Sequence, residues 1–107
     1  MRRLVLLAAA TAAMAHGSPS AAEIHTVTMS GMAYAPESLT ARVGDSIRFV
    51  NDDATDHVVF VPTVGHAVDL GAQEPGTEKI LPLMKVGTFE VECVNHDHML
   101  LTVEVQP

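Results

Sequence analysis

Seven consecutive residues, 93–99, bring a thiol, two imidazoles and a thioether together in the sequence C-V-N-H-D-H-M. Soft sulfur, two imidazoles in a plane and a weak axial thioether form the donor set that suits copper as it cycles between Cu(I) and Cu(II). Zinc more often takes a closed tetrahedral set and seldom uses methionine. The stretch therefore predicts a mononuclear copper site.

The individual residues each have a plainer interpretation. Cys93, the one cysteine of the chain, could be a buried inert thiol, and Met99 could simply fill the core. His57, which opens the apolar segment H-V-V-F-V, could be a core histidine bonded to the backbone. Their occurrence together favours metal ligation, and either His96 or His98 could supply the second imidazole.

Short β-type segments flank these residues and must position them. The segment T-F-E-V-E-C alternates with period two, so Phe89, Val91 and Cys93 share one face. Pro82 lacks a backbone donor and suits an edge strand. No helix is expected beyond a turn near residues 66–70. The expected strands, which together predict an all-β sandwich, are 24–30, 39–43, 46–51, 57–61, 78–83, 88–93 and 101–105.

The N-terminus has the layout of a secretory signal peptide, with a basic start, a short apolar run and a small-residue exit. The apolar run is too short to span a bilayer stably. We expect cleavage after Ala22, with Ala15 as the alternative site. Residues 1–22 are then a signal peptide, and residues 23–107 are the mature domain.

The mature domain is strongly acidic. Residues 23–107 hold four basic and all thirteen acidic side chains of the chain, so their net charge is 4 − 13 = −9. Phosphates and anionic membrane surfaces would repel this domain, which excludes nucleic-acid binding. No segment of it is an uninterrupted apolar run of membrane length, so membrane insertion is not expected. A domain this small often needs a disulfide or a metal to supplement its core, and with one cysteine a metal is the candidate.

Four parts of the sequence together resemble one known family. They are the spacing Cys93-x2-His96-x2-Met99, the segment Y-A-P-E-S-L-T at 34–40, the segment V-G-D-S-I-R-F-V-N at 43–51, and D-H-V-V at 56–59. The chain resembles the cupredoxins, the small blue (type I) copper proteins, and its ligand loop is similar to the short loop of the amicyanin-like members.

The resemblance implies a Greek-key β-sandwich of about six to eight strands with copper at one end. It implies that His57, Cys93 and His96 bind the metal in a plane and that Met99 binds axially. Two positions depart from the family pattern. Val58 stands where many members have an asparagine that ties the two ligand loops together, and Val94 stands where serine or threonine is common.

The function that the resemblance implies is electron transfer rather than enzymatic catalysis. The protein would be a periplasmic monomer that exchanges one electron with a redox partner, such as a c-type cytochrome or a periplasmic dehydrogenase. The acidic surface suits a basic partner. The alternative function is that of a periplasmic copper chaperone or copper-tolerance protein, which binds and delivers copper without redox shuttling.

Overall fold

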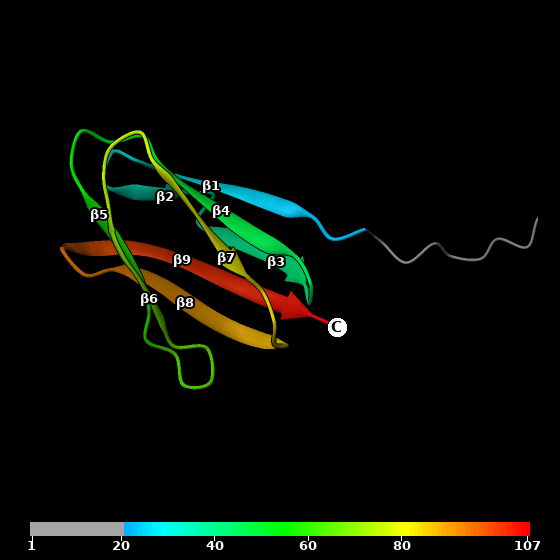
Figure 1. Ribbon diagram of the computed structural model, residues 1–107. Helices are drawn as coiled ribbons and strands as arrows, with labels where there is room; N and C mark the ends of the chain where they lie inside the picture. Colours follow the sequence, from blue (N-terminus) through cyan, green and yellow to red (C-terminus); the bar gives the residue numbers. More distant parts are fainter. Residues whose placement is uncertain (1–20) are drawn as a thin grey trace, which may run out of the picture.

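The computed structural model describes residues 21–107, which form an all-β sandwich (Figure 1). This range contains no helix, and so no helix long and apolar enough to cross a membrane. Most of the expected signal peptide, including the alternative cleavage site at Ala15, lies outside the described residues. The strands are β1 (Ile24–Ser30), β2 (Ala33–Ala35), β3 (Ser38–Arg42), β4 (Ser46–Asn51), β5 (His57–Val61), β6 (Val68–Gln73), β7 (Glu78–Pro82), β8 (Gly87–Cys93) and β9 (His96–Gln106).

The strands form two sheets with crossovers between them. One sheet has the order β2-β1-β4-β7, and the other has the order β3-β9-β8-β5-β6. β1 runs parallel to β4, and β3 runs parallel to β9, whereas the remaining neighbours are antiparallel. Because β5 begins where β8 ends and β9 begins, residues 57, 93 and 96 come to one end of the sandwich, on the left in Figure 1.

Alternating side chains of both sheets fill the space between them. In β8 the residues Phe89, Val91 and Cys93 are buried while their neighbours are exposed, as the period-two pattern predicts. β1 and β4 contribute fully buried residues such as Met29 and Phe49 from the opposite sheet. The core therefore reaches the end of the sandwich where residues 57, 93 and 96 lie, and Cys93 is its last member on β8.

All seven expected strands are present, and β7, which contains Pro82, is an edge strand as predicted. Two strands were missed. β2 has only three residues, too few to show a period, and β6 has no apolar run because it lies at the edge of its sheet. The prediction of a turn near residues 66–70 was therefore wrong for residues 68–70, which belong to β6. β9 also begins five residues earlier than predicted, at His96.

Candidate metal centre

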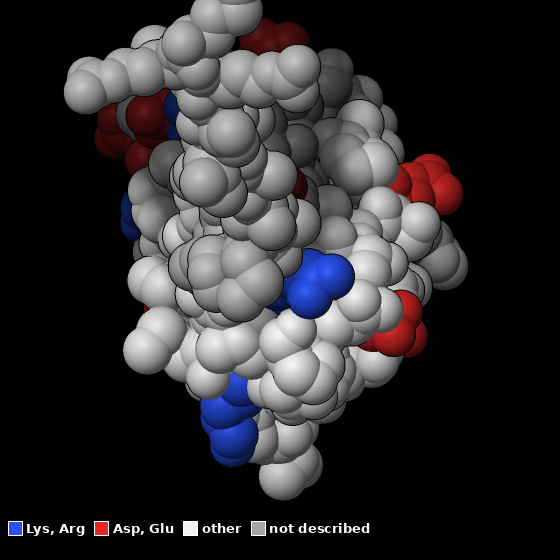
Figure 2. Space-filling model, turned by 90° about the vertical axis from the view of Figure 1, so that its right-hand side faces the viewer, with Lys and Arg blue, Asp and Glu red and all other residues white. Residues whose placement is uncertain are grey.

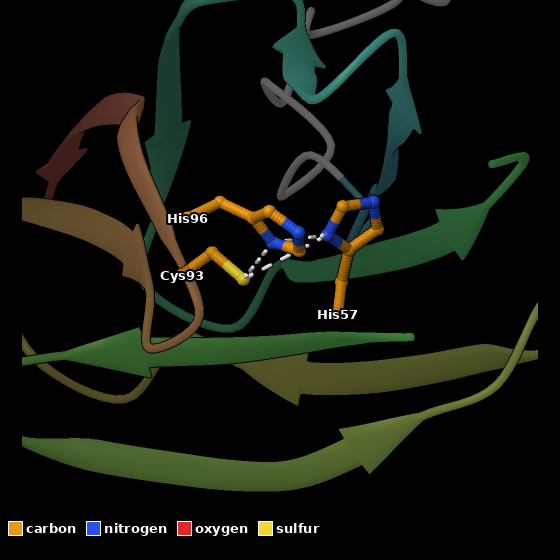
Figure 3. Close-up of side chains that lie close together, drawn as sticks. All are labelled: His57, Cys93 and His96. Atoms are coloured by element: carbon orange, nitrogen blue, oxygen red, sulfur yellow. Dashed lines mark hydrogen bonds between the residues drawn. The ribbon is translucent and has the colours of Figure 1, made fainter. Parts of the chain in front are cut away.

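Three of the four predicted ligands bring their donor atoms together (Figure 3). The Nδ1 atoms of His57 and His96 lie 3.2 Å apart. The Sγ atom of Cys93 lies 3.7 Å from Nδ1 of His57 and 3.4 Å from Nδ1 of His96. His57 and Cys93 are 0% and 6% exposed, whereas His96 is half-buried. Three electron-pair donors thus face one small, largely buried space.

The turn between β8 and β9 produces this convergence. Cys93 pairs with His96 and Glu92 pairs with Leu100, so three residues of β9 have no partner on β8. A bulge of this kind bends its strand and redirects the side chains. The backbone of His98, in the middle of these three residues, adopts the left-handed conformation with φ of 64°. The bulge lets Cys93 and His96 turn toward the same point although only two residues separate them.

The remaining nitrogen of His57 is bound by a carboxylate. Its Nε2 lies 2.7 Å from Oδ2 of Asp53, and the Asp53 side chain is 13% exposed. Asp53 also accepts hydrogen bonds from the backbone N–H groups of Gly31 and Met32. The hydrogen bond from His57, with these backbone bonds, holds the pKa of Asp53 below its ordinary value. An ionised Asp53 keeps the proton of His57 on Nε2, which leaves Nδ1 with a free electron pair for a metal.

Backbone groups tie the two ligand segments together. The N–H of Val58 donates to Sγ of Cys93 at 3.3 Å, and the N–H of Val94 donates to the carbonyl of Val58 at 3.3 Å. The asparagine that many cupredoxins have at position 58 joins the two segments through its side chain, which Val58 cannot do. Here the two backbone hydrogen bonds of Val58 join the segments instead. The end of β8 is anchored as well, because the Tyr34 hydroxyl donates to the carbonyl of Glu92, the residue before Cys93, at 2.9 Å.

A buried pair of amides supports the segment that carries Asp53 and His57. Nδ2 of Asn51 donates to the carbonyls of Thr55 and Gln73, and its Oδ1 accepts from the N–H of Asp53. Nε2 of Gln73 donates to the carbonyls of Phe49 and Thr77. Both amide side chains are buried. The predicted ligand His57 is therefore held in place by Asn51 of the opposite sheet, through the segment before it, as well as by its own strand.

The other two candidates lie on β9 near this site. Met99 is 2% exposed and belongs to the same buried cluster as Cys93. His98 is exposed and is not among the residues whose donor atoms converge. A surface depression of about 420 Å³ opens beside the site, and His96 and His98 both line it. Of the two histidines that the sequence left open, only His96 joins the described cluster.

The three converging donors fit a metal ion of copper's size. Three donors in a plane at about 2.0–2.3 Å from one ion lie about 3.5–4 Å from one another. The observed separations of 3.2, 3.4 and 3.7 Å are close to these values. A buried sulfur beside two imidazoles is also the soft and intermediate donor combination expected for copper.

Sequence reasoning did not find Asp53, Asn51 or Gln73 as parts of this site. The acidic group of residues 52, 53 and 56 has the composition of a solvated loop, and Asp52 and Asp56 are exposed. Asp53 is the exception. Its position four residues before His57, together with the tendency of ligand histidines to bind a carboxylate through their second nitrogen, was the available signal.

Comparisons with known proteins bear on the family and the fold of this chain. The family model described as a cupredoxin-like domain matches residues 3–103. The methylamine utilization protein MauL of Methylorubrum extorquens is 29% identical over 106 residues, which cover 98% of this chain and 93% of the relative. A methionine-to-alanine variant of amicyanin in its Cu(I) form superposes with a TM-score of 0.72 at 23% identity, over 78% of this chain and 82% of that chain. The copper-containing nitrite reductase NirK of Thermus scotoductus also gives 0.72 at 23% identity, over 78% of this chain and 22% of that chain.

The structural likenesses are below 25% identity and bear on the fold, which they share as a two-sheet β-sandwich. The family match extends over nearly the whole chain. Together with a sulfur and two imidazoles converging at one end, this match supports copper as the cofactor. The chain belongs to the cupredoxin-like family.

Proposed function

We propose that this protein is a one-electron carrier with a mononuclear copper site. His57, Cys93 and His96 would hold the copper ion through two imidazole nitrogens and one sulfur, and Met99 would be the fourth ligand. The observation that carries the proposal is the triangle of two Nδ1 atoms and one Sγ atom, with sides of 3.2–3.7 Å and a buried sulfur. Bound copper supplies the Cu(I)/Cu(II) couple there.

The surrounding residues keep the ligands in one arrangement for both oxidation states. Asp53 fixes the ring of His57, and the N–H of Val58 fixes the sulfur of Cys93. A fixed donor set needs little rearrangement when an electron arrives or leaves, which favours fast transfer. Of the two proposed ligands that line the surface depression, Cys93 is buried and His96 is the more exposed, so we place the path of the electron through the ring of His96.

The same observations favour electron transfer over copper delivery. A delivery protein must release its metal to an acceptor, which is easier from exposed and loosely held ligands. Here His57 is fully buried and two ligands are anchored by hydrogen bonds. We also propose that the protein is not an enzyme, since its relative MauL is described by a role in methylamine utilization and not by a reaction.

Charge and the printed name of the relative MauL support the proposed partner, and the leader-like N-terminal sequence supports the proposed compartment. The two segments at the metal end, 52–57 and 92–98, contain no Lys or Arg and include five acidic residues. An acidic end suits a basic partner, such as a c-type cytochrome or a dehydrogenase of methylamine oxidation. We place the protein in the periplasm as a monomer, exported by the signal peptide of residues 1–22.

Copper titration of the full chain, followed by visible absorption and voltammetry, tests the proposal. We expect intense visible absorption from the copper–thiolate bond at one equivalent of Cu(II), and a reversible one-electron couple. Cys93→Ser should lose the colour, and His96→Gln should lose much more of it than His98→Gln. Copper that passes readily to a chelator, with weak absorption and no reversible couple, would instead favour delivery.

A further inference from the structure

A second group of metal-binding side chains lies at the opposite end of the sandwich. Its members are Glu23, His25 and Asp45, whose ligand atoms all lie within 4.8 Å of one another. In Figure 1 the start of β1 and the end of β9 are at the right, whereas the turn between β8 and β9 is at the left. This group is therefore separate from the copper centre.

The parallel pairing of β1 with β4 brings these residues together. Glu23 and His25 are two residues apart along an extended chain, so their side chains point to the same side. Asp45 directly precedes β4, whose first residue, Ser46, is paired with Ile24. The Nε2 atom of His25 lies 2.9 Å from Oδ2 of Asp45 and 3.9 Å from Oε2 of Glu23.

Asp45 is held as a ready ligand. Its side chain is 8% exposed, and its carboxylate accepts hydrogen bonds from the backbone N–H groups of Glu23 and Arg42. The bond from Glu23, followed by the bond from the His25 side chain, lowers the pKa of Asp45 to about 2. The carboxylate is thus ionised and oriented at neutral pH, so its ordering is already part of the fold.

Space for a hydrated cation adjoins the three residues. A hollow of about 520 Å³ is lined by all of them, by the chain end at Gln106 and Pro107, and by Ala21 and Ala22, which cleavage after Ala22 would remove and so open the hollow further. Arg42 also lines the hollow, but its guanidinium donates to the carbonyl of Pro107 at 3.3 Å. Figure 2 shows this end of the molecule, where basic and acidic side chains are interspersed on the visible surface.

We propose that Glu23, His25 and Asp45 form a second metal site that takes a divalent d-block cation such as Zn²⁺. Imidazole and carboxylate donors suit these ions, and waters in the hollow would complete the coordination. Two ligand atoms at about 2.0–2.2 Å from a tetrahedral ion lie about 3.3–3.6 Å apart. The separations of 2.9 Å between His25 and Asp45 and 3.9 Å between His25 and Glu23 lie on either side of this range. The cation takes the place of the hydrogen between Nε2 of His25 and Oδ2 of Asp45, and the neutral ring of His25 then carries its one N–H proton on Nδ1.

The proposed site is independent of the copper centre, both in its residues and in its harder donors. Zn²⁺ titration followed by NMR of the histidine rings in the full chain is the direct test. We expect the ring resonances of His25 to shift saturably, and to shift in the same way in the Cys93→Ser chain. The ring resonances of His57 and His96 report separately on the copper centre, so a failure of the proposed copper site can be distinguished from a failure of this second site.

Two variants test the ligands, with affinity read from the same titration. Glu23 is exposed, so Glu23→Gln does not threaten folding, and it should weaken Zn²⁺ binding at His25 at least about tenfold. His66 is stacked on Phe89 and is not among the residues that line the hollow, so His66→Gln is the control that should leave the binding unchanged. Unchanged His25 resonances on addition of Zn²⁺, or equal affinity in Glu23→Gln, would overturn the proposal.

Discussion

At the scale of single residues, Asp53 distinguishes the proposed ligand His57 from a merely buried histidine. A core histidine needs one hydrogen bond to the backbone, whereas His57 has a carboxylate at 2.7 Å on Nε2 and a sulfur and a second imidazole on the other side. That carboxylate is in turn fixed by two backbone N–H groups. Such an arrangement orients one ring nitrogen toward a shared point.

Replacing Asp53 with Asn should therefore weaken copper binding without abolishing it. Asparagine keeps an oxygen for Nε2 of His57 but removes the negative charge. We expect about 10–100-fold lower copper affinity in a chelator competition, the range typical for residues that support a ligand. The reduction potential should rise, because the negative charge of Asp53 stabilises Cu(II) more than Cu(I) and the variant lacks this charge. Asp52→Asn, an exposed neighbour, is the control, and equal affinity in both variants would contradict this role for Asp53.

At the scale of strands, the chain was most predictable where one face is buried. β8 and β4 alternate buried and less buried residues, and their bounds follow from period two with an error of at most one residue. β6 lies at a sheet edge, and although its sequence V-D-L-G-A-Q alternates, none of its apolar residues is fully buried and Gly71 interrupts the strand signal. The spacing was enough to predict Cys93 and His96 as candidate ligands. The bulge that keeps His98 out of the converging cluster depends on the pairing of β8 with β9, which the spacing does not show.

Asn51 and Gln73 link β4, β6 and the segment before β5 through buried amides, and their removal should have unequal costs. Asn51→Leu leaves two carbonyls and the N–H of Asp53 without partners, which should cost about 2–4 kcal/mol of unfolding free energy. Gln73→Leu should cost less, because Oε1 of Gln73 has no hydrogen-bond partner among the residues described. Denaturant unfolding measures both, with the exposed Gln106→Leu as control. A larger loss for Gln73→Leu would contradict this account.

Asp45 joins the start of β1 to the turn before β4, so this junction should be sensitive to acid. Its pKa is lowered from 3.8 to about 2 in the folded protein, chiefly by the hydrogen bond from the N–H of Glu23. A lowered pKa stabilises the fold above the unfolded value, and this stabilisation is lost as pH falls from about 4 towards about 2.

Asp45→Asn should flatten the fall in unfolding free energy over that pH range. Denaturant midpoints measured with a chelator present, at several pH values from 7 to 2, give the comparison. Asp52→Asn, at an exposed position, should retain the full acid dependence. An Asp45→Asn chain that loses stability as steeply as the unchanged protein would show that other carboxylates control the acid transition.

At the scale of the whole molecule, the charge distribution separates the two ends. The copper end carries acidic side chains without a basic one in its two ligand segments, whereas the opposite end displays both signs (Figure 2). With a net charge of −9 over residues 23–107, attraction of a basic partner is long-ranged at low salt. In the proposed function, the acidic copper end orients a basic partner toward His96, where the electron would cross.

Electron exchange with a basic c-type cytochrome should therefore slow by about tenfold or more as ionic strength rises from about 0.01 to 0.3 M, because added salt shortens the Debye length. Stopped-flow rates test whether position matters beyond net charge. Asp56→Lys and Asp97→Lys, at the copper end, should each slow the reaction more than Glu104→Lys, an equally exposed change near the far end of β9. Equal slowing by all three would mean that net charge alone controls association and that the partner does not dock at the copper end.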